Sequence, residues 1–184
     1  LDTHDNYTQT LTYSVTSILK GQPYNAKTSI HLIAYIAGAT LAVLESHSGD
    51  SQPIYRASMT DEGITYVQQA AGQPCRASQD ITRSDPIPDP TLRLPPVFGA
   101  KEIGRGNMAG IPAIQYQFDQ RAVRYAAGQT GTASGELWVA EEGDLLLKYS
   151  LTIESTKGET PGVQTWEYTL DQINASEPIS LPEG

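Results

Sequence analysis

A strict two-residue alternation of apolar side chains constrains the fold of this chain more than any other sequence feature. Leu145, Leu147, Tyr149, Leu151 and Ile153 all occupy odd positions. Successive side chains of a β-strand point to opposite faces, so this spacing predicts a strand with one buried face. The alternation belongs to a longer run, residues 101–155, in which further strands are joined by tight turns. The apolar face of such a sheet must lie against a second layer, a partner protein or an apolar ligand.

Similar patterns predict about ten strands along the chain, almost all joined by short turns. Short turns favour an antiparallel meander, and no strong amphipathic helix interrupts the series. We therefore predict an α+β fold that is mainly β, a large curved antiparallel sheet shaped as a half-barrel. The expected strands are residues 8–20, 26–37, 41–46, 54–60, 64–69, 101–106, 111–119, 136–142, 144–155 and 163–174, with a weaker candidate at 122–126.

One segment, residues 70–99, lacks this periodicity. It is rich in proline, aspartate and serine, and so long an irregular stretch in a compact domain usually covers a site or is disordered. Residues 91–94 are compatible with one helical turn that Pro95 ends. We predict a single domain over residues 1–184, with residues 70–99 as a lid across the concave side and residues 177–184 as a flexible tail.

The charge balance limits the classes of molecule that the protein is expected to bind. The 184 residues carry a net charge of −9 with only 12 Lys and Arg. Binding to nucleic acid, or to an anionic membrane surface, depends mainly on such cations. We therefore expect neither partner. The lone Cys75 cannot form an intramolecular disulfide, and we interpret it as a structural thiol.

Catalytic motifs give little support to an enzyme. The chain has no nucleophile elbow, zinc-protease motif, phosphate loop or paired cysteines. Glu45, His47 and Asp50 place three potential ligands within six residues, but a lone cluster of this kind is more often a solvated turn. Residues 85–89 carry two carboxylates with a spacing unlike known calcium loops. We expect no catalytic residues, no metal and no cofactor, and keep a metal-dependent enzyme as a distant third hypothesis.

Three stretches resemble a known family. They are residues 110–119, a glycine turn feeding a strand that ends Tyr-Gln-Phe-Asp, residues 135–144, a strand with a Trp followed by an acidic turn, and residues 147–151. Together they are similar to the bacterial lipoprotein-carrier superfamily of LolA, LolB, LppX and LprG, and to uncharacterised secreted lipoproteins of Chloroflexi. The resemblance implies a curved sheet that wraps a few helices and encloses a cavity for acyl chains. This chain departs from the family in its scarcity of helical signal.

The resemblance also implies a location. Family members of this kind are lipoproteins of the bacterial envelope or extracellular space. The sequence begins abruptly at Leu1 and Asp2, so we expect a leader and a lipidated cysteine upstream of Leu1. Contact with a membrane would then be through that anchor.

The favoured function is non-enzymatic binding or carriage of a lipid or other apolar ligand in the concave face. Tyr and Trp join an apolar body to a polar tip, which suits the wall of a cavity for an amphiphile. For any single aromatic, ordinary core packing is the competing interpretation. In this favoured function, the stretch around Leu92, Leu94, Val97 and Phe98 would be the gate. The alternative function is a protein-interaction or sensor module that uses the same face. The candidate cavity and gate residues are Tyr35, Tyr66, Leu92, Leu94, Phe98, Tyr116, Phe118, Trp138, Tyr149 and Trp166.

Overall fold

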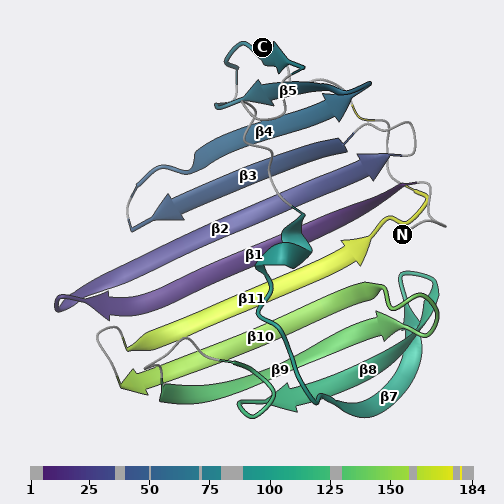
Figure 1. Cartoon of the computed structure of the whole chain (residues 1–184). Helices are drawn as coiled ribbons and strands as arrows, with labels where there is room; N and C mark the ends of the chain where they lie inside the picture. The colour runs from purple at the N-terminus through teal and green to yellow at the C-terminus, as the bar shows by residue number, and fades with distance from the viewer. Residues whose placement is uncertain are drawn as a thin grey trace.

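The protein is built on one open antiparallel sheet of eleven strands (Figure 1). The computed structural model describes residues 6–35, 40–49, 51–70, 72–79, 89–124, 130–157, 161–175 and 179. The strands are β1 (Asn6–Leu19), β2 (Gln22–Tyr35), β3 (Thr40–Ser48), β4 (Ile54–Asp61), β5 (Ile64–Gln68), β6 (Arg76–Ser78), β7 (Lys101–Met108), β8 (Ile111–Asp119), β9 (Thr130–Ala140), β10 (Leu146–Lys157) and β11 (Gly162–Asp171). Among the described residues the one helical element is the 3₁₀ turn η1 (Pro90–Arg93).

Tight turns fix the register of the hairpins. Lys20 and Gly21 both have positive φ, as a two-residue type I′ turn requires, and they pair Leu19 with Gln22 at the end of β1 and β2. Ala109 and Gly110 make the same kind of turn between β7 and β8. The predicted turn at residues 21–25 is therefore shorter than expected, since β2 starts at Gln22.

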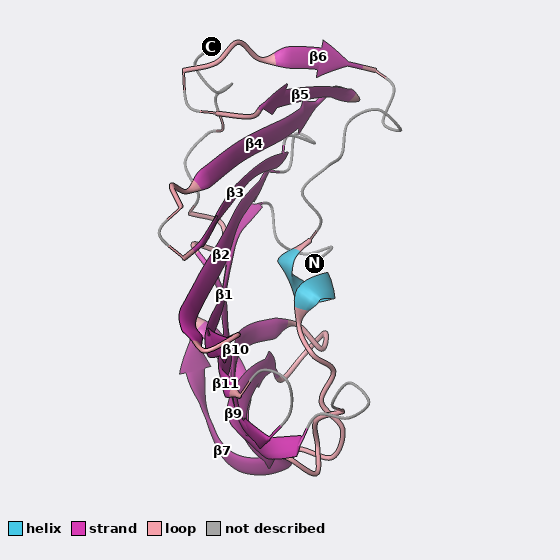
Figure 2. Cartoon of the chain, turned by 90° about the vertical axis from the view of Figure 1, so that its left-hand side faces the viewer, coloured by secondary structure: helices cyan, strands magenta, loops and turns pink. Residues whose placement is uncertain are grey.

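The sheet curves so that one face is concave, and η1 lies on that side (Figure 2). Directly paired residues of antiparallel strands point to the same face. Leu11 pairs with Ile30 of β2 and with Tyr168 of β11, and all three are at most 2% exposed. The concave face is therefore the apolar, buried face around β1.

The convex face of β1 is polar. Between Thr8 and Thr16 its side chains are all hydroxyls, and several of them pair with polar side chains of the neighbouring strands. Thr10 Oγ1 lies 3.0 Å from His31 Nδ1, and Ser14 Oγ lies 2.9 Å from Thr165 Oγ1. The two faces of β1 thus differ in the way that the period-two pattern predicts.

The strand order explains how the concave face is covered. The order is β6-β5-β4-β3-β2-β1-β11-β10-β9-β8-β7, so β6 and β7, consecutive in sequence, are the two opposite edges. With strands about 4.8 Å apart, the edges are about 48 Å apart along the sheet. The 22 residues from 79 to 100 can span about 73 Å when extended. Their described part, residues 89–100, runs over the concave face (Figures 1 and 2). We call residues 89–100 the crossing segment.

The structure confirms the mainly β fold and the curved antiparallel sheet, and it corrects several details. The tentative strand at 122–126 is wrong for the described residues, because Arg121 and Ala122 form a turn and Val123 makes a single bridge to Val97. β6 falls inside the stretch for which no strand was expected. β9 begins at Thr130, six residues before its predicted start. The predicted tail, 177–184, lies outside the described residues apart from residue 179.

Candidate ligand-binding site

The crossing segment packs tightly onto one part of the concave face, formed by β8, β9 and β10. The Tyr149 hydroxyl donates a hydrogen bond of 2.9 Å to the Pro95 carbonyl oxygen. The Phe98 backbone N–H donates to the Ala122 carbonyl at 2.7 Å. Phe118 lies beneath, 5% exposed, with its ring centroid 5.8 Å from that of Tyr149. We call this the packed part of the concave face.

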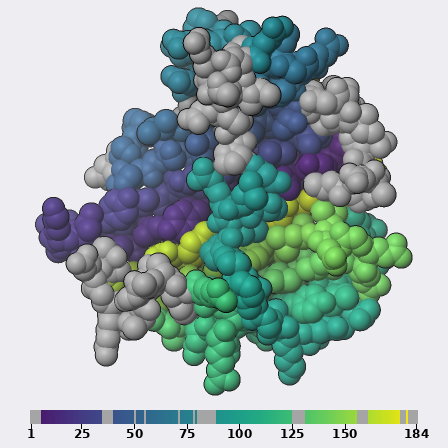
Figure 3. All heavy atoms as spheres, viewed as in Figure 1, coloured from purple at the N-terminus to yellow at the C-terminus, as the bar shows by residue number. Residues whose placement is uncertain are grey.

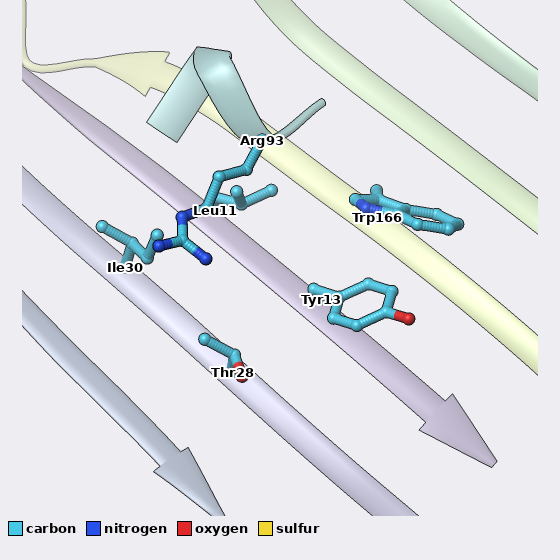
Figure 4. Close-up of a pocket in the computed structure, with 6 residues that line it drawn as sticks. All are labelled: Leu11, Tyr13, Thr28, Ile30, Arg93 and Trp166. Carbon is cyan, nitrogen blue, oxygen red and sulfur yellow. The ribbon is translucent and has the colours of Figure 1, made fainter. Parts of the chain in front are cut away.

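The face is not filled where it is formed by β1, β2 and β11. A cavity of about 330 Å³ opens there beside η1 (Figure 4). Ligand pockets in proteins range from about 300 to 1,000 Å³, so the cavity is at the small end of that range. Its lining residues are Leu11, Tyr13, Thr28, Ile30, Arg93 and Trp166.

Register brings these lining residues together. Tyr13 pairs with Thr28 on one side and Trp166 on the other, and Leu11 and Ile30 are the pair one step along the strands. Side chains of paired residues share a face, so five of the six lining positions point from three adjacent strands toward η1. Arg93 comes from η1 and reaches across the cavity toward Ile30 (Figure 4).

An aromatic pair forms one wall of the cavity. The rings of Tyr13 and Trp166 lie with their centroids 4.7 Å apart and their planes tilted by 37°. The Tyr13 hydroxyl donates a 3.4 Å hydrogen bond to Gln164 Oε1. Burial raises the pKa of Tyr13, and nearby Tyr24 raises this pKa further. The tyrosine is therefore neutral at physiological pH, and the wall is apolar with one hydroxyl.

A short capped helix holds Arg93 in place. Asp89 Oδ1 accepts hydrogen bonds of 2.8 Å from both the backbone N–H and the side-chain hydroxyl of Thr91, which fixes the start of η1. Pro90 is fully buried and anchors the turn to the sheet. Within the described residues, no hydrogen bond or ion pair involves the Arg93 side chain, which is exposed to solvent at the cavity.

Asp89 also affects the tyrosines beside η1. Burial is the main cause that raises the pKa of Tyr168, and the charge of Asp89 adds to it. The pKa of Tyr7 is raised for the same two reasons. Gln9 Nε2 donates to the Tyr168 hydroxyl oxygen at 3.0 Å in this buried layer. The floor under η1 is thus poorly solvated.

A second cavity, of about 280 Å³, continues along the same strands. It is lined by Val15, Ser17, Leu19, Tyr24, Gly162 and Gln164. These are the next concave-face positions after Tyr13, Thr28 and Trp166, because Val15 pairs with Gln164 and Ser17 pairs with Gly162 and Tyr24. The two cavities are therefore neighbours in a row that follows β1 from Leu11 to Leu19.

A larger hollow of about 660 Å³ lies beside Phe98 and Phe118. Lys101, Asp119 and Arg121 are also among its lining residues, together with polar Gln117 and Ser134. So many charged and polar groups make it a poor site for an apolar chain. Phe98 itself is 52% exposed and lies under the Arg124 guanidinium, 4.7 Å from the ring centroid.

The predicted cavity and gate residues fall into four groups: on the concave face, in the crossing segment, on the opposite face, and outside the described side chains. Tyr116, Phe118, Tyr149 and Trp166 belong to the concave face by register, but among these four only Trp166 lines the 330 Å³ cavity. Leu94 packs against the core from the crossing segment, whereas Leu92 is 78% exposed.

Tyr66 and Trp138 belong to the opposite face. Tyr66 pairs with Met59, and Trp138 pairs with Lys148, whose ammonium binds Glu136 at 2.6 Å on the convex side. Trp138 lies over Gly106 of β7. Tyr35 ends β2 opposite Asn6, and its side chain is outside the described part of the structure.

The sequence prediction missed Leu11, Tyr13, Thr28, Ile30 and Arg93 as cavity residues. Leu11 and Tyr13 do share the alternating pattern of residues 8–20, so that pattern signals their common face. Arg93 carries no such signal, because a single charged residue in a proline-rich stretch has no periodicity. It becomes informative only when the topology brings η1 over β1 and β2.

The hypothetical metal ligands divide between described and undescribed residues. Glu45 and His47 lie on one face of β3, paired with Ser29 and Lys27. Asp50 is outside the described residues. No group of three His, Cys, Asp or Glu side chains able to hold a metal ion is found within the ranges that the structure describes. In those same ranges, no helix is long and apolar enough to cross a membrane.

Comparison with known proteins gives little further information. No protein-family model matches the chain, and no curated protein sequence matches it. One solved structure with some likeness is a DUF1329 family protein from Desulfovibrio piger, at 11% sequence identity and a TM-score of 0.28. The match covers 92% of this chain and 86% of that protein. A likeness this weak supports no statement about function.

Proposed function

We propose that the protein binds a small apolar or amphiphilic molecule, non-enzymatically, in the cavity between η1 and strands β1, β2 and β11. One observation carries the proposal. Over β8 to β10 the chain's own side chains cover the concave face except for a charged and polar hollow beside Phe98 and Phe118. An apolar cavity of about 330 Å³ is left where Leu11, Ile30 and Trp166 line the face. Apolar surface left in this way is what an alkyl chain would bury.

The size of the cavity limits the ligand. At about 330 Å³ it holds one short or medium alkyl chain or one ring system, and not several long acyl chains at once. Each methylene that enters contributes about 0.8 kcal/mol, equivalent to a roughly fourfold gain in affinity. A homologous series of alcohols should therefore bind with affinities that rise about fourfold per methylene until the cavity is full.

The direct test is native mass spectrometry of the purified protein, followed by lipid extraction and titration with 1-decanol. We expect a co-purifying amphiphile and a stoichiometry of one for decanol. Thr28→Phe fills the cavity from its β2 side and should abolish binding. Lys27→Phe, one residue away on the convex face, is the matched control and should leave binding intact.

The result separates the alternatives. A protein that binds neither decanol nor any co-purified amphiphile contradicts this function and favours the interaction module. Equal loss of binding in the Thr28 and Lys27 variants would place the ligand elsewhere.

The proposal extends to a place in the bacterial envelope, held by a lipid anchor upstream of this chain. Its support is the resemblance to lipoprotein carriers and a composition poor in charge and rich in Ser, Thr and Gln. Fractionation of the source cells with an antibody against this domain tests it. Recovery in the cytosolic fraction would contradict it.

A further inference from the structure

The charge at the cavity narrows the class of ligand. Arg93 is the single charged residue among the six described residues that line the cavity, and the other five are Leu, Ile, Trp, Tyr and Thr. Within the described residues its guanidinium has no hydrogen bond or ion pair. The nearest acid along the chain, Asp89, uses its Oδ1 to cap η1. The site therefore combines an apolar floor with a cation that has no acidic partner among the residues that the structure describes.

The positions of the two cavities along β1 indicate how an elongated ligand would be oriented in this site. The first cavity contains Arg93, and the second begins at the next concave-face positions, Val15 and Gln164. Between Leu11 and Leu19 the row extends along eight residues of β1, or about 27 Å at roughly 3.4 Å per residue. Tyr13 of the first cavity and Tyr24 of the second are close enough for Tyr24 to raise the pKa of Tyr13. The row is long enough for an extended single chain.

We propose that the ligand is a single-chain fatty carboxylate, with its head at Arg93 and its tail along β1 toward Leu19. This inference rests on the proposed function and adds the head group and the orientation. A guanidinium binds a carboxylate through paired N–H donors. Because Arg93 is exposed, the gain over a neutral head is modest, about threefold to tenfold.

The preference for a carboxylate head group is tested by comparing the binding of decanoate and 1-decanol, each at a concentration below that at which it aggregates. Trp166 is in the cavity wall and is one of only two tryptophans, so its fluorescence reports binding in a Trp138→Phe background. We expect decanoate to bind about threefold to tenfold more tightly than decanol. Arg93→Gln should remove that preference, so that decanoate binds no more tightly than decanol, and Arg93→Lys should keep part of it. Lys27→Gln removes a convex-face charge and should change nothing.

The outcomes distinguish the two proposals. If decanol binds but decanoate shows no preference, or if the preference survives Arg93→Gln, the carboxylate assignment is wrong and the proposed function stands. If neither probe binds the wild type, both fail. Circular dichroism and the urea-unfolding free energy of Arg93→Gln check that the fold is intact.

The proposed direction of the ligand's tail is tested by filling the second cavity with a larger side chain. Val15→Trp fills it, and Thr16→Trp places the same ring on the other face, where Thr16 is exposed. We expect Val15→Trp to weaken hexadecanoate at least tenfold and octanoate less than twofold, with no such difference for Thr16→Trp. Equal weakening of both chain lengths, or of neither, would overturn the tail direction.

Discussion

The concave face contains two neighbouring regions that differ in how closely the crossing segment packs against them. Over β8 to β10 the crossing segment is bonded down through Pro95 and Phe98, and Phe118 and Tyr149 fill the space beneath it. Over β1, β2 and β11 the same segment contributes only η1, and a cavity remains. Figure 3 shows the segment lying across both regions. One apolar face is thus filled by the chain's own side chains in one region and left with a cavity in the other.

The largest expected effect is in the packed part. Phe118→Ala removes a buried ring that contacts Tyr149 and lies over Gly135. Such truncations cost about 3–5 kcal/mol of unfolding free energy, measurable by urea denaturation. Leu92→Ala, on the exposed side of η1, should cost less than about 0.5 kcal/mol. A small effect of Phe118→Ala would mean that this region is not packed as the comparison requires.

The next largest effect is expected from the loss of the hydrogen bond between Tyr149 and the Pro95 carbonyl, which holds the crossing segment on the sheet. Tyr149→Phe leaves the Pro95 carbonyl without its donor, at an expected cost of about 1–2 kcal/mol. It should also speed tryptic cleavage after Arg93, because the segment is released. Tyr13→Phe removes a long hydrogen bond in the cavity part and should leave that cleavage rate unchanged. Equal cleavage of the two variants would contradict the assignment of the anchor.

Alkaline pH tests the burial of Tyr149 in the packed part. Burial raises the pKa of Tyr149 well above its usual value of about 10. A tyrosine with a raised folded-state pKa stabilises the protein fully below pH 10 and loses that contribution as pH rises, about 1.4 kcal/mol by pH 11. Tyr149→Phe should therefore flatten the fall in stability between pH 9 and 11, measured by thermal unfolding. An unchanged pH profile would show that the hydroxyl is solvated.

The smallest stability effect is expected in the cavity part. Thr28→Phe adds apolar atoms where space is free, so the unfolding free energy should change by less than about 1 kcal/mol. Thr28→Val, nearly the same size as Thr, separates the loss of the hydroxyl from the filling. A loss as large as that of Phe118→Ala would show that no usable cavity exists there.

Local patterns in the sequence were enough to predict most strands. The alternation at residues 145–153 identified β10, since Leu147, Tyr149 and Leu151 are all buried. Pro95 correctly ended the single helical turn. The start of β9 was missed because Thr-Gly-Thr-Ala-Ser-Gly has small side chains and little apolar signal. Gly135 is small for a structural reason, because a side chain there would collide with Phe118.

The cavity could not be predicted in the same way. It depends on the pairing of β1 with β11, which joins residues more than 140 positions apart, such as Tyr13 and Trp166. Alternation tells which side chains share a face of one strand, but not which strands are neighbours. Arg93 depends on the same topology. Sequence reasoning therefore found the face and several aromatics on it, and missed the cavity lining except for Trp166.

The pairing of β1 with β11 has a consequence for how the fold holds together. The chain consists of two meanders, β1 to β6 and β7 to β11, and this pairing is the seam between them. The cavity lies across the seam, because Tyr13 comes from the first strand and Trp166 from the last. A ligand seated there touches both ends of the folded sequence at once. Its binding energy would therefore stabilise the association of the two meanders. Without a ligand, the β1–β11 pair joins them and the crossing segment bridges them.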